Sequence, residues 1–469
     1  MKIKIQYKAI LISLLSLVLM EISYSASLLE VYQRALQSDP MIHEAESRRL
    51  AALEGETQAR SWLLPELSVG SRYSINNFDG SSVEAGAAGS IASVTSQSKN
   101  INTGWQLQLT QSVFQWDRWV GLKQAGKRSA KAEIDYEIAQ QDLIIRVVTR
   151  YLDVLAAEDN LVSVNSNKLS IARQLEQAKK RFEVGLIAIT AVQESQAAYD
   201  QIVAGEINAK RSLATARELL REITGAYLPK LNAPDDTLPL KTPNPEVEAE
   251  WIALAMQQNL RLISNRFDEE IARHQISFER TGHYPSLNVV ANLGAQDSDT
   301  EDQIRNSINF PNLSTSNQSD SITLQVSIPL YSGGKTSSKV QEAVYLHRAS
   351  REKLQRVARE TERETRDTYL GVTSEISRVK ALGQAVKSSK TALEATQAGF
   401  EVGTRTIVDV LNSQFALEAA NKNHAKSRYD YIANVFRLKK AAGSLRVQDI
   451  EEIDVWLKER PSPEEILTQ

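Results

Sequence analysis

Hydrophobic and polar residues alternate along four separate stretches of the chain, which is the pattern of β-strands with one apolar and one polar face. In the second stretch, for example, Trp105, Leu107 and Leu109 alternate with glutamine and threonine residues. The alternation predicts four strands, at about residues 65–77, 102–115, 285–295 and 321–331. Loops rich in serine, glycine and asparagine, at about 77–101 and 296–320, are expected to connect the members of each pair.

A helical period follows each pair of predicted strands. One apolar stripe has the i, i+3, i+4, i+7 spacing of a helix face and consists of Ile144, Val147, Val148, Tyr151, Leu152 and Leu155. The pattern predicts long helices at about 118–183, 188–225, 336–400 and 405–443. A helix of roughly 60 residues is about 90–100 Å long. Because this exceeds any compact core, the long helices are expected to pack on one another as coiled coils.

The chain contains an internal repeat. The segment that follows Phe182 matches the segment that follows Phe400 without a gap, with nine identities in seventeen positions that include Phe-Glu-Val-Gly in both copies. Gly185 and Gly403 supply the positive φ that closes a helix cheaply. Thr190 and Thr404 are candidate N-caps of the returning helices. An ordinary helical-hairpin tip explains one copy, whereas two copies 218 residues apart favour a duplicated architecture.

The prolines divide the chain. All twelve lie outside residues 66–228 and 330–460, and five of them cluster between 229 and 245. The predicted organisation is therefore a first repeat at 26–225, a proline-rich linker at 226–247, a second repeat at 248–443 and a C-terminal tail at 444–469.

Residues 1–25 have the features of a secretory signal peptide. Three lysines precede the twelve-residue apolar core Ala9–Met20, and small residues follow it. Without this segment the formal net charge changes from −3 to −5, which does not favour nucleic-acid binding. The chain has no cysteine, so disulfides and lipid attachment at a cleavage-site cysteine are excluded.

An exported chain with amphipathic strands of this kind predicts an outer-membrane β-barrel, and Trp116 and Trp119 lie where a membrane interface is expected. Four strands leave open edges that lipid cannot satisfy. Two chains with eight strands or three chains with twelve would remove these edges, so the chain is expected to oligomerise. A soluble β-sandwich and a pore-less periplasmic coiled-coil or adaptor protein are the competing hypotheses.

The sequence indicates no enzyme, metal site or cofactor. Its five histidines form no zinc-spaced cluster, and no Ser/His/Asp arrangement is evident. Ser332–Thr336 resembles part of a phosphate-binding loop, but the full pattern requires glycine at Pro329. A strand-to-helix turn is the better interpretation of this segment.

The order of strand, strand, long helix, turn and helix, found twice, resembles the TolC family of outer-membrane efflux proteins. The motifs that carry the resemblance are LQLTQSVFQWDRW (107–119), RFEVGLIAITAVQ (181–193), LQVSIPLYSGG (324–334) and GTRTIVDVLN (403–412). The resemblance covers essentially the whole chain after the signal peptide. It implies an α+β membrane protein: a homotrimer with a twelve-stranded transmembrane barrel, four strands per chain, continued by a periplasmic coiled-coil barrel. It also places the linker and the C-terminal tail in an equatorial region.

The resemblance implies an outer-membrane exit duct that extends into the periplasm and is closed at its periplasmic tip. An inner-membrane ABC or proton-driven transporter and a periplasmic adaptor recruit such ducts to export drugs or secreted proteins. Gly185, Gly403, Val184 and Val402 are the expected adaptor-docking positions at the helix tips. Outer-membrane lipid is the remaining expected partner, and nucleic acid is not.

The resemblance also assigns gate residues. Arg405 matches an arginine that ties the inner coiled coil to its neighbour, and Thr190 matches its partner side. Asp409 matches the first of two aspartates at the constriction. The chain departs from the family pattern where Phe400 replaces a tyrosine, Ala191 replaces an aspartate and Asn412 replaces the second constriction aspartate. A weaker latch and a thinner anionic ring are therefore expected.

Overall fold

The computed structural model describes residues 25–85, 91–234, 238–306 and 308–461. The predicted signal peptide lies outside the described residues except for Ser25. The chain divides into two compact units. The sheet unit consists of Arg49–Ala132 and Arg266–Lys353, and the helical unit consists of Met1–Arg48, Glu133–Asn265 and Leu354–Gln469.

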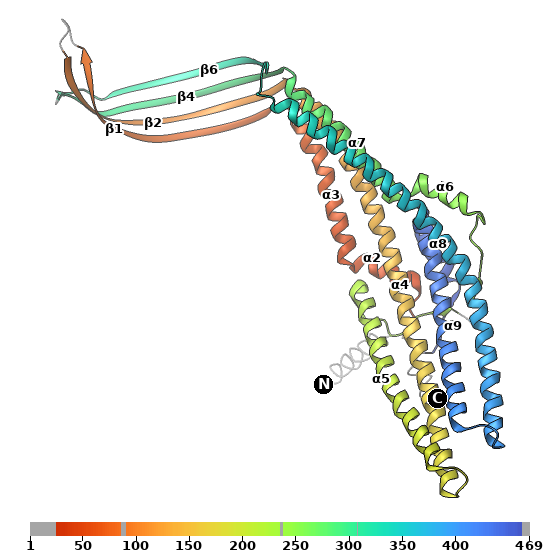
Figure 1. Cartoon of the computed structure of the whole chain (residues 1–469). Coiled ribbons are helices and arrows are strands. Elements are labelled where there is room, and N and C mark those ends of the chain that lie inside the picture. The colour runs from red at the N-terminus through yellow and green to blue at the C-terminus, as the bar shows by residue number, and fades with distance from the viewer. Residues whose placement is uncertain (1–24, 86–90, 235–237, 307, 462–469) are drawn as a thin grey trace, which may run out of the picture. The chain divides into compact units, whose positions relative to one another are not determined.

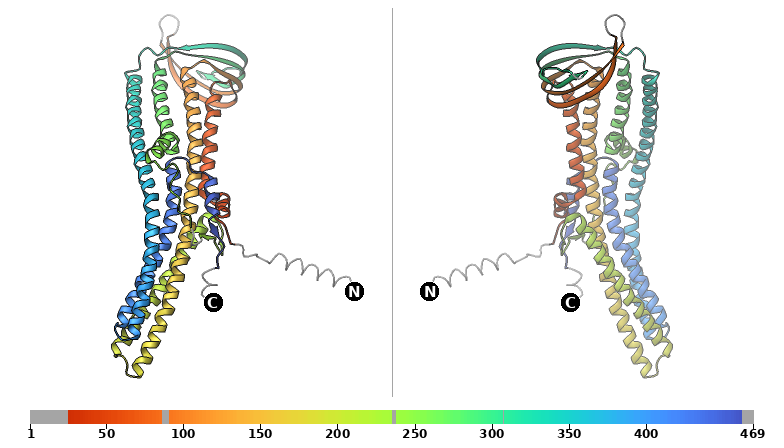
Figure 2. Two further views of the ribbon diagram at one scale, coloured as in Figure 1. Left: turned by 90° about the vertical axis from the view of Figure 1, so that its right-hand side faces the viewer. Right: turned by 90° about the vertical axis from the view of Figure 1, so that its left-hand side faces the viewer.

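The sheet unit contains an antiparallel sheet in which strand order is β1-β2-β4-β6. The strands are β1 (Glu66–Ala85), β2 (Ile91–Phe114), β4 (Ser286–Arg305) and β6 (Leu313–Ser327), and the short β5 (Ile308–Asn309) also pairs with β4. The long strands lie side by side and form a curled sheet (Figure 1, Figure 2). Helical residues of the same unit come from α3 (Pro40–Ser61), α4 (Trp116–Glu183), α7 (Leu260–Arg280) and α8 (Lys335–Glu401).

The predicted loops at 77–101 and 296–320 are wrong, because most of their residues belong to the strands. β1 pairs with β2 from Glu66↔Thr110 to Ala85↔Ile91, and β4 pairs with β6 as far as Thr300↔Leu313. The backbone ladder holds these serine- and asparagine-rich segments in extended conformation without help from apolar side chains. The strands have 20, 24, 20 and 15 residues, so they are longer than the sequence pattern predicts.

The helical unit is built around two helical hairpins. One joins α4 to α5 (Ile189–Thr224), and the other joins α8 to α9 (Ile407–Ala441); both turn at the same end of the unit (Figure 1). The sequence predicts these helices within two residues of the observed ends. The shorter helices were not predicted from the sequence. In the described residues they are α2 (Leu28–Ser38), α3, α6 (Glu248–Gln258), α7, the 3₁₀ turn η2 (Thr281–His283) and α10 (Val447–Asp454).

The predicted stripe of α4 is the core of the helical unit. All six of its residues are buried, and Val147, Tyr151 and Leu155 have no exposed surface. The Tyr151 hydroxyl donates to the Asn232 carbonyl oxygen at 2.6 Å, which satisfies the polar end of this buried ring. Strands β3 (Ala233–Pro234) and β7 (Leu457–Lys458) pair beside this core and join the linker to the C-terminal tail. The prediction of a buried stripe is confirmed.

Ser332–Thr336 is a turn that leads into α8, as predicted. Gly333 and Gly334 have φ of 62° and 81°, and α8 begins at Lys335. Within the part of the chain that the structure describes, no helix combines the length and apolar character needed to cross a membrane.

Candidate functional site

The turn between α4 and α5 is closed by a Schellman motif. Gly185 has φ of 76°, and its N–H donates to the Phe182 carbonyl at 2.9 Å. The N–H of Leu186 donates to the Arg181 carbonyl at 2.8 Å. These two bonds satisfy carbonyls that the helix end leaves free. Any residue other than glycine at position 185 would strain the backbone.

The turn between α8 and α9 repeats this geometry. Gly403 has φ of 79°, and its N–H donates to the Phe400 carbonyl at 3.2 Å. The N–H of Thr404 donates to the Gly399 carbonyl at 2.8 Å. A Cβ on Gly399 would lie 2.8 Å from Arg405 Cγ, so the absence of a side chain at 399 makes room for the arginine stem.

The N-caps of the returning helices differ from those predicted. The N-cap of α9 is Thr406, because the Thr404 hydroxyl instead donates to the Gly399 carbonyl. The N-cap of α5 is Ala188, which makes no side-chain capping bond, and Thr190 lies one residue inside that helix. The shared N-cap prediction was therefore wrong for both copies, since the aligned residues 188 and 406 are chemically different.

Thr406 and Asp409 form a capping box at the start of α9. The Thr406 N–H and hydroxyl both donate to Asp409 Oδ2 at 2.9 Å, and the Asp409 N–H donates to Thr406 Oγ1 at 3.2 Å. The hydrogen bonds from the Thr406 backbone and hydroxyl, with a smaller contribution from the Arg405 charge, lower the pKa of the Asp409 carboxyl. Asp409 therefore carries its charge at neutral pH and also stabilises the first turn of α9.

Both tips present apolar side chains to solvent. The exposed fractions are 69% for Val184, 72% for Leu186 and 76% for Val402. A Cβ on Gly185 or Gly403 would meet no atom within 4 Å. Another chain could therefore approach the backbone of both turns directly.

Of the expected gate residues, Phe400, Arg405, Asp409 and Asn412 lie near the second tip and Thr190 lies near the first. No hydrogen bond or salt bridge joins them into a latch within the described segments. Arg405 and Asn412 are exposed, and Thr190 is exposed on α5. In the same segments the Arg405 guanidinium makes no hydrogen bond or salt bridge, and the link between Arg405 and Thr190 stays a prediction. Ala191 is half-buried on α5, where it contributes no polar group.

Phe400 has a partner that the sequence did not indicate. The Arg181 guanidinium carbon lies 4.8 Å from the centroid of the Phe400 ring. This cation–π contact joins the end of α4 to the end of α8 within one chain. Phe400 stands where the family pattern has a tyrosine, and the loss of the tyrosine hydroxyl was expected to weaken the latch.

Trp116 and Trp119 lie at the first turn of α4, where β2 gives way to the helix. Their exposed fractions are 44% and 48%, and the Trp116 ring stacks on Phe114 with centroids 6.4 Å apart. The expectation that these two residues lie at a membrane interface stays a prediction.

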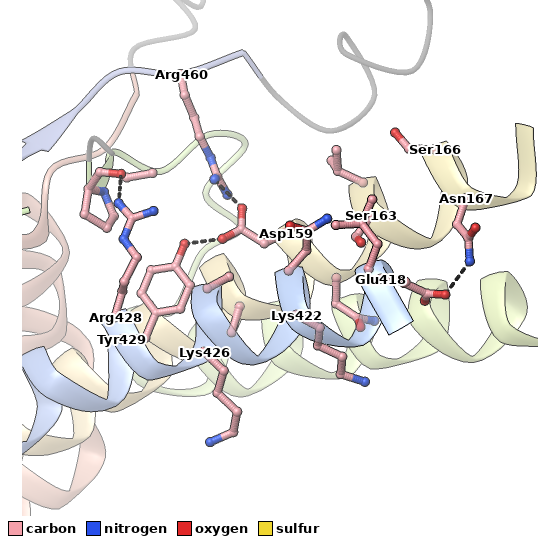
Figure 3. A pocket seen from close by; sticks show the side chains of 18 of the residues that line it. Asp159, Ser163, Ser166, Asn167, Glu418, Lys422, Lys426, Arg428, Tyr429 and Arg460 are labelled. Atoms are coloured by element: carbon pink, nitrogen blue, oxygen red, sulfur yellow. Dashed lines mark hydrogen bonds and ion pairs between the residues drawn. The ribbon is translucent and has the colours of Figure 1, made fainter. Parts of the chain in front are cut away.

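A pocket of about 790 Å³ with a mixed polar and apolar lining lies between α4, α9 and the β3–β7 pair (Figure 3). Asp159 accepts hydrogen bonds from the Tyr429 hydroxyl and an Arg460 guanidinium nitrogen, each at 2.5 Å. A second guanidinium nitrogen of Arg460 lies 3.2 Å from the Glu158 carboxylate, which also pairs with Arg217 at 3.2 Å. Sequence analysis missed this cluster because Asp159 is 270 positions from Tyr429 and 301 positions from Arg460.

The charges of this cluster compensate one another. Burial, reinforced by the Asp159 charge, raises the pKa of Tyr429, so the tyrosine remains a proton donor. Burial alone would lower the pKa of Arg460, but attraction to the carboxylates of Asp159 and Glu158 outweighs it and raises this pKa. The cluster anchors the C-terminal segment to α4. Among the described residues, no group of three or more His, Cys, Asp or Glu side chains is arranged to hold a metal.

Comparison with known proteins identifies the protein family to which the chain belongs. The family model described as "Outer membrane efflux protein" matches residues 31–226 and 251–444. The chain belongs to the outer membrane efflux protein family. The two matched segments include both helical hairpins and the four long strands.

Curated members of the outer membrane efflux family match nearly the whole chain. Outer membrane protein TolC of Vibrio cholerae is 37% identical over 438 residues, which cover 93% of this chain and 94% of the relative. Outer membrane protein TolC of Escherichia coli K12 is 35% identical over 453 residues, which cover 96% and 89%. The Campylobacter jejuni CmeC outer membrane channel has the same fold, with a TM-score of 0.70 at 16% identity over 92% of this chain and 90% of that one.

Membership of the outer membrane efflux family establishes the location and general role of this chain. It is an outer-membrane protein and acts as an exit duct in efflux or secretion. A periplasmic coiled-coil protein without a pore is not favoured. The family consists of channels rather than enzymes.

Proposed function

We propose that three copies of the chain form a homotrimer in which twelve strands close into one transmembrane barrel. The supporting observation is that both edges of the sheet are open. Within the described segments, β1 pairs only with β2, and β6 pairs only with β4. Lipid offers no hydrogen bonds to these edges, so they must pair with other copies.

Three copies account for a duct better than two. An eight-stranded barrel has an interior just wide enough for its own side chains, so a dimer would leave little open channel. Twelve strands leave a wider interior. The exposed apolar face of β6, which includes Ile322, Leu324 and Val326, would then face lipid.

The helical hairpins would form the periplasmic barrel and its gate. Arg405 would link the α8–α9 hairpin of one copy to α5 of a neighbour near Thr190. Asp409 would ring the constriction with Asn412 nearby, and Phe400 would hold the two hairpins of each copy together. The exposed guanidinium of Arg405 and the ionised carboxylate of Asp409 support these roles.

The two hairpins represent two tandem repeats in this proposal. Both end in Schellman turns with glycine φ values of 76° and 79°. Each hairpin follows a pair of antiparallel strands in chain order, β1 and β2 or β4 and β6. The similar backbone of the two halves is evidence for an internal duplication, in addition to the sequence identities between them.

The exposed tips would dock a periplasmic adaptor, which joins the duct to an inner-membrane ABC or proton-driven transporter. Drugs or secreted proteins would pass through passively, and nucleic acid would not be a partner. The apolar surface of Val184 and Val402 beside open glycine backbone fits such docking.

Native mass spectrometry in detergent tests the assembly. A complex of three chains is expected, and a stable monomer or dimer would overturn the trimer. A photo-crosslinking residue at Val402 should capture an adaptor in cells, whereas one at Val455, which is 80% exposed in the C-terminal segment, should not. Equal capture at both positions, or capture at neither, would contradict docking at the tips.

A further inference from the structure

The sheet has a polar face that is defined by its register. Directly opposed residues on antiparallel strands share a face, and alternate residues of each strand share it too. On this face the Gln106 side-chain amide donates to Asn292 Oδ1 at 3.0 Å, and the Ser298 hydroxyl donates to Asn102 Oδ1 at 2.8 Å. The polar face therefore carries cross-strand hydrogen bonds between uncharged side chains.

The opposite face of the same strands is apolar over one band. Leu107 opposes Leu293, and Val289 opposes Leu324. In an outer-membrane barrel an apolar band of this kind contacts lipid. Consequently the polar face is the one that lines the duct.

The polar face is almost free of charge. Its residues in the central part of the sheet are Ser68, Gly70, Arg72, Ser74 and Asn76 on β1; Asn100, Asn102, Gly104, Gln106, Gln108 and Thr110 on β2; Asn288, Val290, Asn292, Gly294, Gln296, Ser298 and Thr300 on β4; and Thr315, Asn317, Ser319, Ser321, Thr323 and Gln325 on β6. Arg72 is the single ionisable residue in this set, and Glu66 at the start of β1, directly opposite Thr110, is a further charged residue of the same face outside it. Amides and hydroxyls make up most of the remainder.

The surroundings of Arg72 leave its charge uncompensated. Arg72 is exposed, and within the described segments its guanidinium makes no hydrogen bond or salt bridge. It lies directly opposite Gly104 on β2. Gly104 has no side chain that could cover the arginine. A larger residue would not fit easily there, because its Cβ would lie 2.9 Å from the Ala295 carbonyl oxygen.

Lys99 provides a contrast on the other face of the sheet. It opposes Glu301, and its ammonium lies 2.9 Å from that carboxylate. The positive charge of Lys99 is thus neutralised locally, and by strand alternation it points away from the duct.

We propose that Arg72 is a charge-selectivity residue of the barrel lumen and favours anions there, including substrates that bear carboxylate or phosphate groups. This inference rests on the proposed trimeric duct, in which three copies of Arg72 would place three positive charges about 20 Å along β1 from Glu66, the nearest opposite charge of this face on that strand. Fixed charges on the wall of a pore concentrate counter-ions, and rings of arginine or lysine select anions. The Asp409 ring near the tip would act separately on cations.

The test uses the purified full-length assembly in planar bilayers under a KCl gradient. Arg72→Gln should shift the reversal potential towards cations and raise the ratio of K⁺ to Cl⁻ permeability about twofold at 0.1 M salt. The shift should shrink at 1 M salt, because the Debye length falls from about 10 Å to about 3 Å. Lys99→Gln is the matched control and should leave the ratio unchanged, since that side chain faces away from the duct.

The outcomes separate this inference from the proposed function. Trimeric channels whose ion preference is the same for wild type and Arg72→Gln, or is changed equally by Lys99→Gln, would overturn the role of Arg72 and leave the duct intact. A wild-type protein that forms no trimer and no channel would overturn the proposed function itself. Arg72→Ser, which matches the serines at 68 and 74 on the same face, gives the same readout if the glutamine variant does not assemble.

Discussion

The guanidinium carbon of Arg181, at the end of α4, lies 4.8 Å from the centroid of the Phe400 ring, near the end of α8. This contact connects the two helical hairpins of one chain close to their tips. A cation over an exposed aromatic ring contributes about 0.5–1 kcal/mol. The hairpins of each copy therefore have a link of their own, independent of any link between copies.

Phe400→Leu should loosen the tips, because leucine retains apolar bulk but offers no π face to Arg181. Hydrogen exchange at the ends of α4 and α8 is expected to become about two- to fivefold faster, as the loss of 0.5–1 kcal/mol implies. The control is Phe182→Leu, at the equivalent repeat position, where the ring is 41% exposed and has no recorded cation partner in the described segments. Equal acceleration in both variants would show that the cation–π contact contributes nothing.

Arg405→Ser should increase single-channel conductance in planar bilayers. If Arg405 latches neighbouring hairpins, charge-assisted hydrogen bonds of about 1.5–3 kcal/mol each are lost, less where salt screens them. The equilibrium then shifts towards the open gate. Lys180→Ser removes another exposed tip cation, but one whose ammonium pairs with Glu176 at 2.7 Å within its own helix. Conductance that rises equally in both variants would point to a general charge effect and away from a latch.

Gly403→Trp should abolish export while trimers still form. A Cβ at this position meets no atom within 4 Å, so the cost to the fold is confined to backbone strain at φ of 79°, roughly 1 kcal/mol. The large side chain would instead block an approaching adaptor. Export assays and native mass spectrometry measure the two effects separately.

Gly333→Trp is the matched control for the tip glycine. Its φ is 62°, and its Cβ would also meet no atom within 4 Å, but it lies at the turn into α8 rather than between two helices of a hairpin. Export should persist in this variant. If Gly403→Trp exports normally, or if both variants lose export with their trimers intact, the docking role of the tip is wrong.

The sequence predicts elements where one periodicity is strong and uninterrupted. The stripe from Ile144 to Leu155 locates α4 and its buried face, and all of its residues are buried. The strands are visible only where one face is apolar. Beyond Ile75 on β1 and Ala295 on β4 that face becomes polar, so the alternation disappears although the backbone ladder continues.

Local signals were available for some of the missed elements. Ser27 and Glu30 form a capping box at the start of α2, and Leu28, Val31, Tyr32 and Ala35 then follow helical spacing. Thr406 and Asp409 have the same three-residue spacing. The cluster of Asp159 and Arg460 had no such signal, because only the tertiary fold brings together residues that are 301 positions apart.

In the proposed trimer, Asp409 would have two separable roles that depend on the same carboxylate. It caps α9 through Thr406, and as one of three copies it would form an anionic ring that attracts cations. Asp409→Ala removes both, so reduced cation preference and weaker block by multivalent cations are expected. Thr406→Ala removes the capping hydroxyl, which is typically worth about 1 kcal/mol, but keeps the charge. Faster hydrogen exchange at 407–410 without a change in ion preference is therefore expected from Thr406→Ala.

The pH dependence of the channel provides the second test of Asp409. Hydrogen bonds from Thr406 lower the pKa of this carboxyl in the folded protein. A depressed carboxyl pKa stabilises the fold above the unfolded pKa of about 3.9, and the contribution is lost as the pH falls through the folded pKa. Cation preference should therefore be present at neutral pH and decline as the pH falls through the folded pKa of this carboxyl. The like charges of the other two copies would shift that pKa upwards relative to a single chain. A cation preference that does not fall on acidification, or a Thr406→Ala channel with the same ion preference as Asp409→Ala, would remove Asp409 from the constriction.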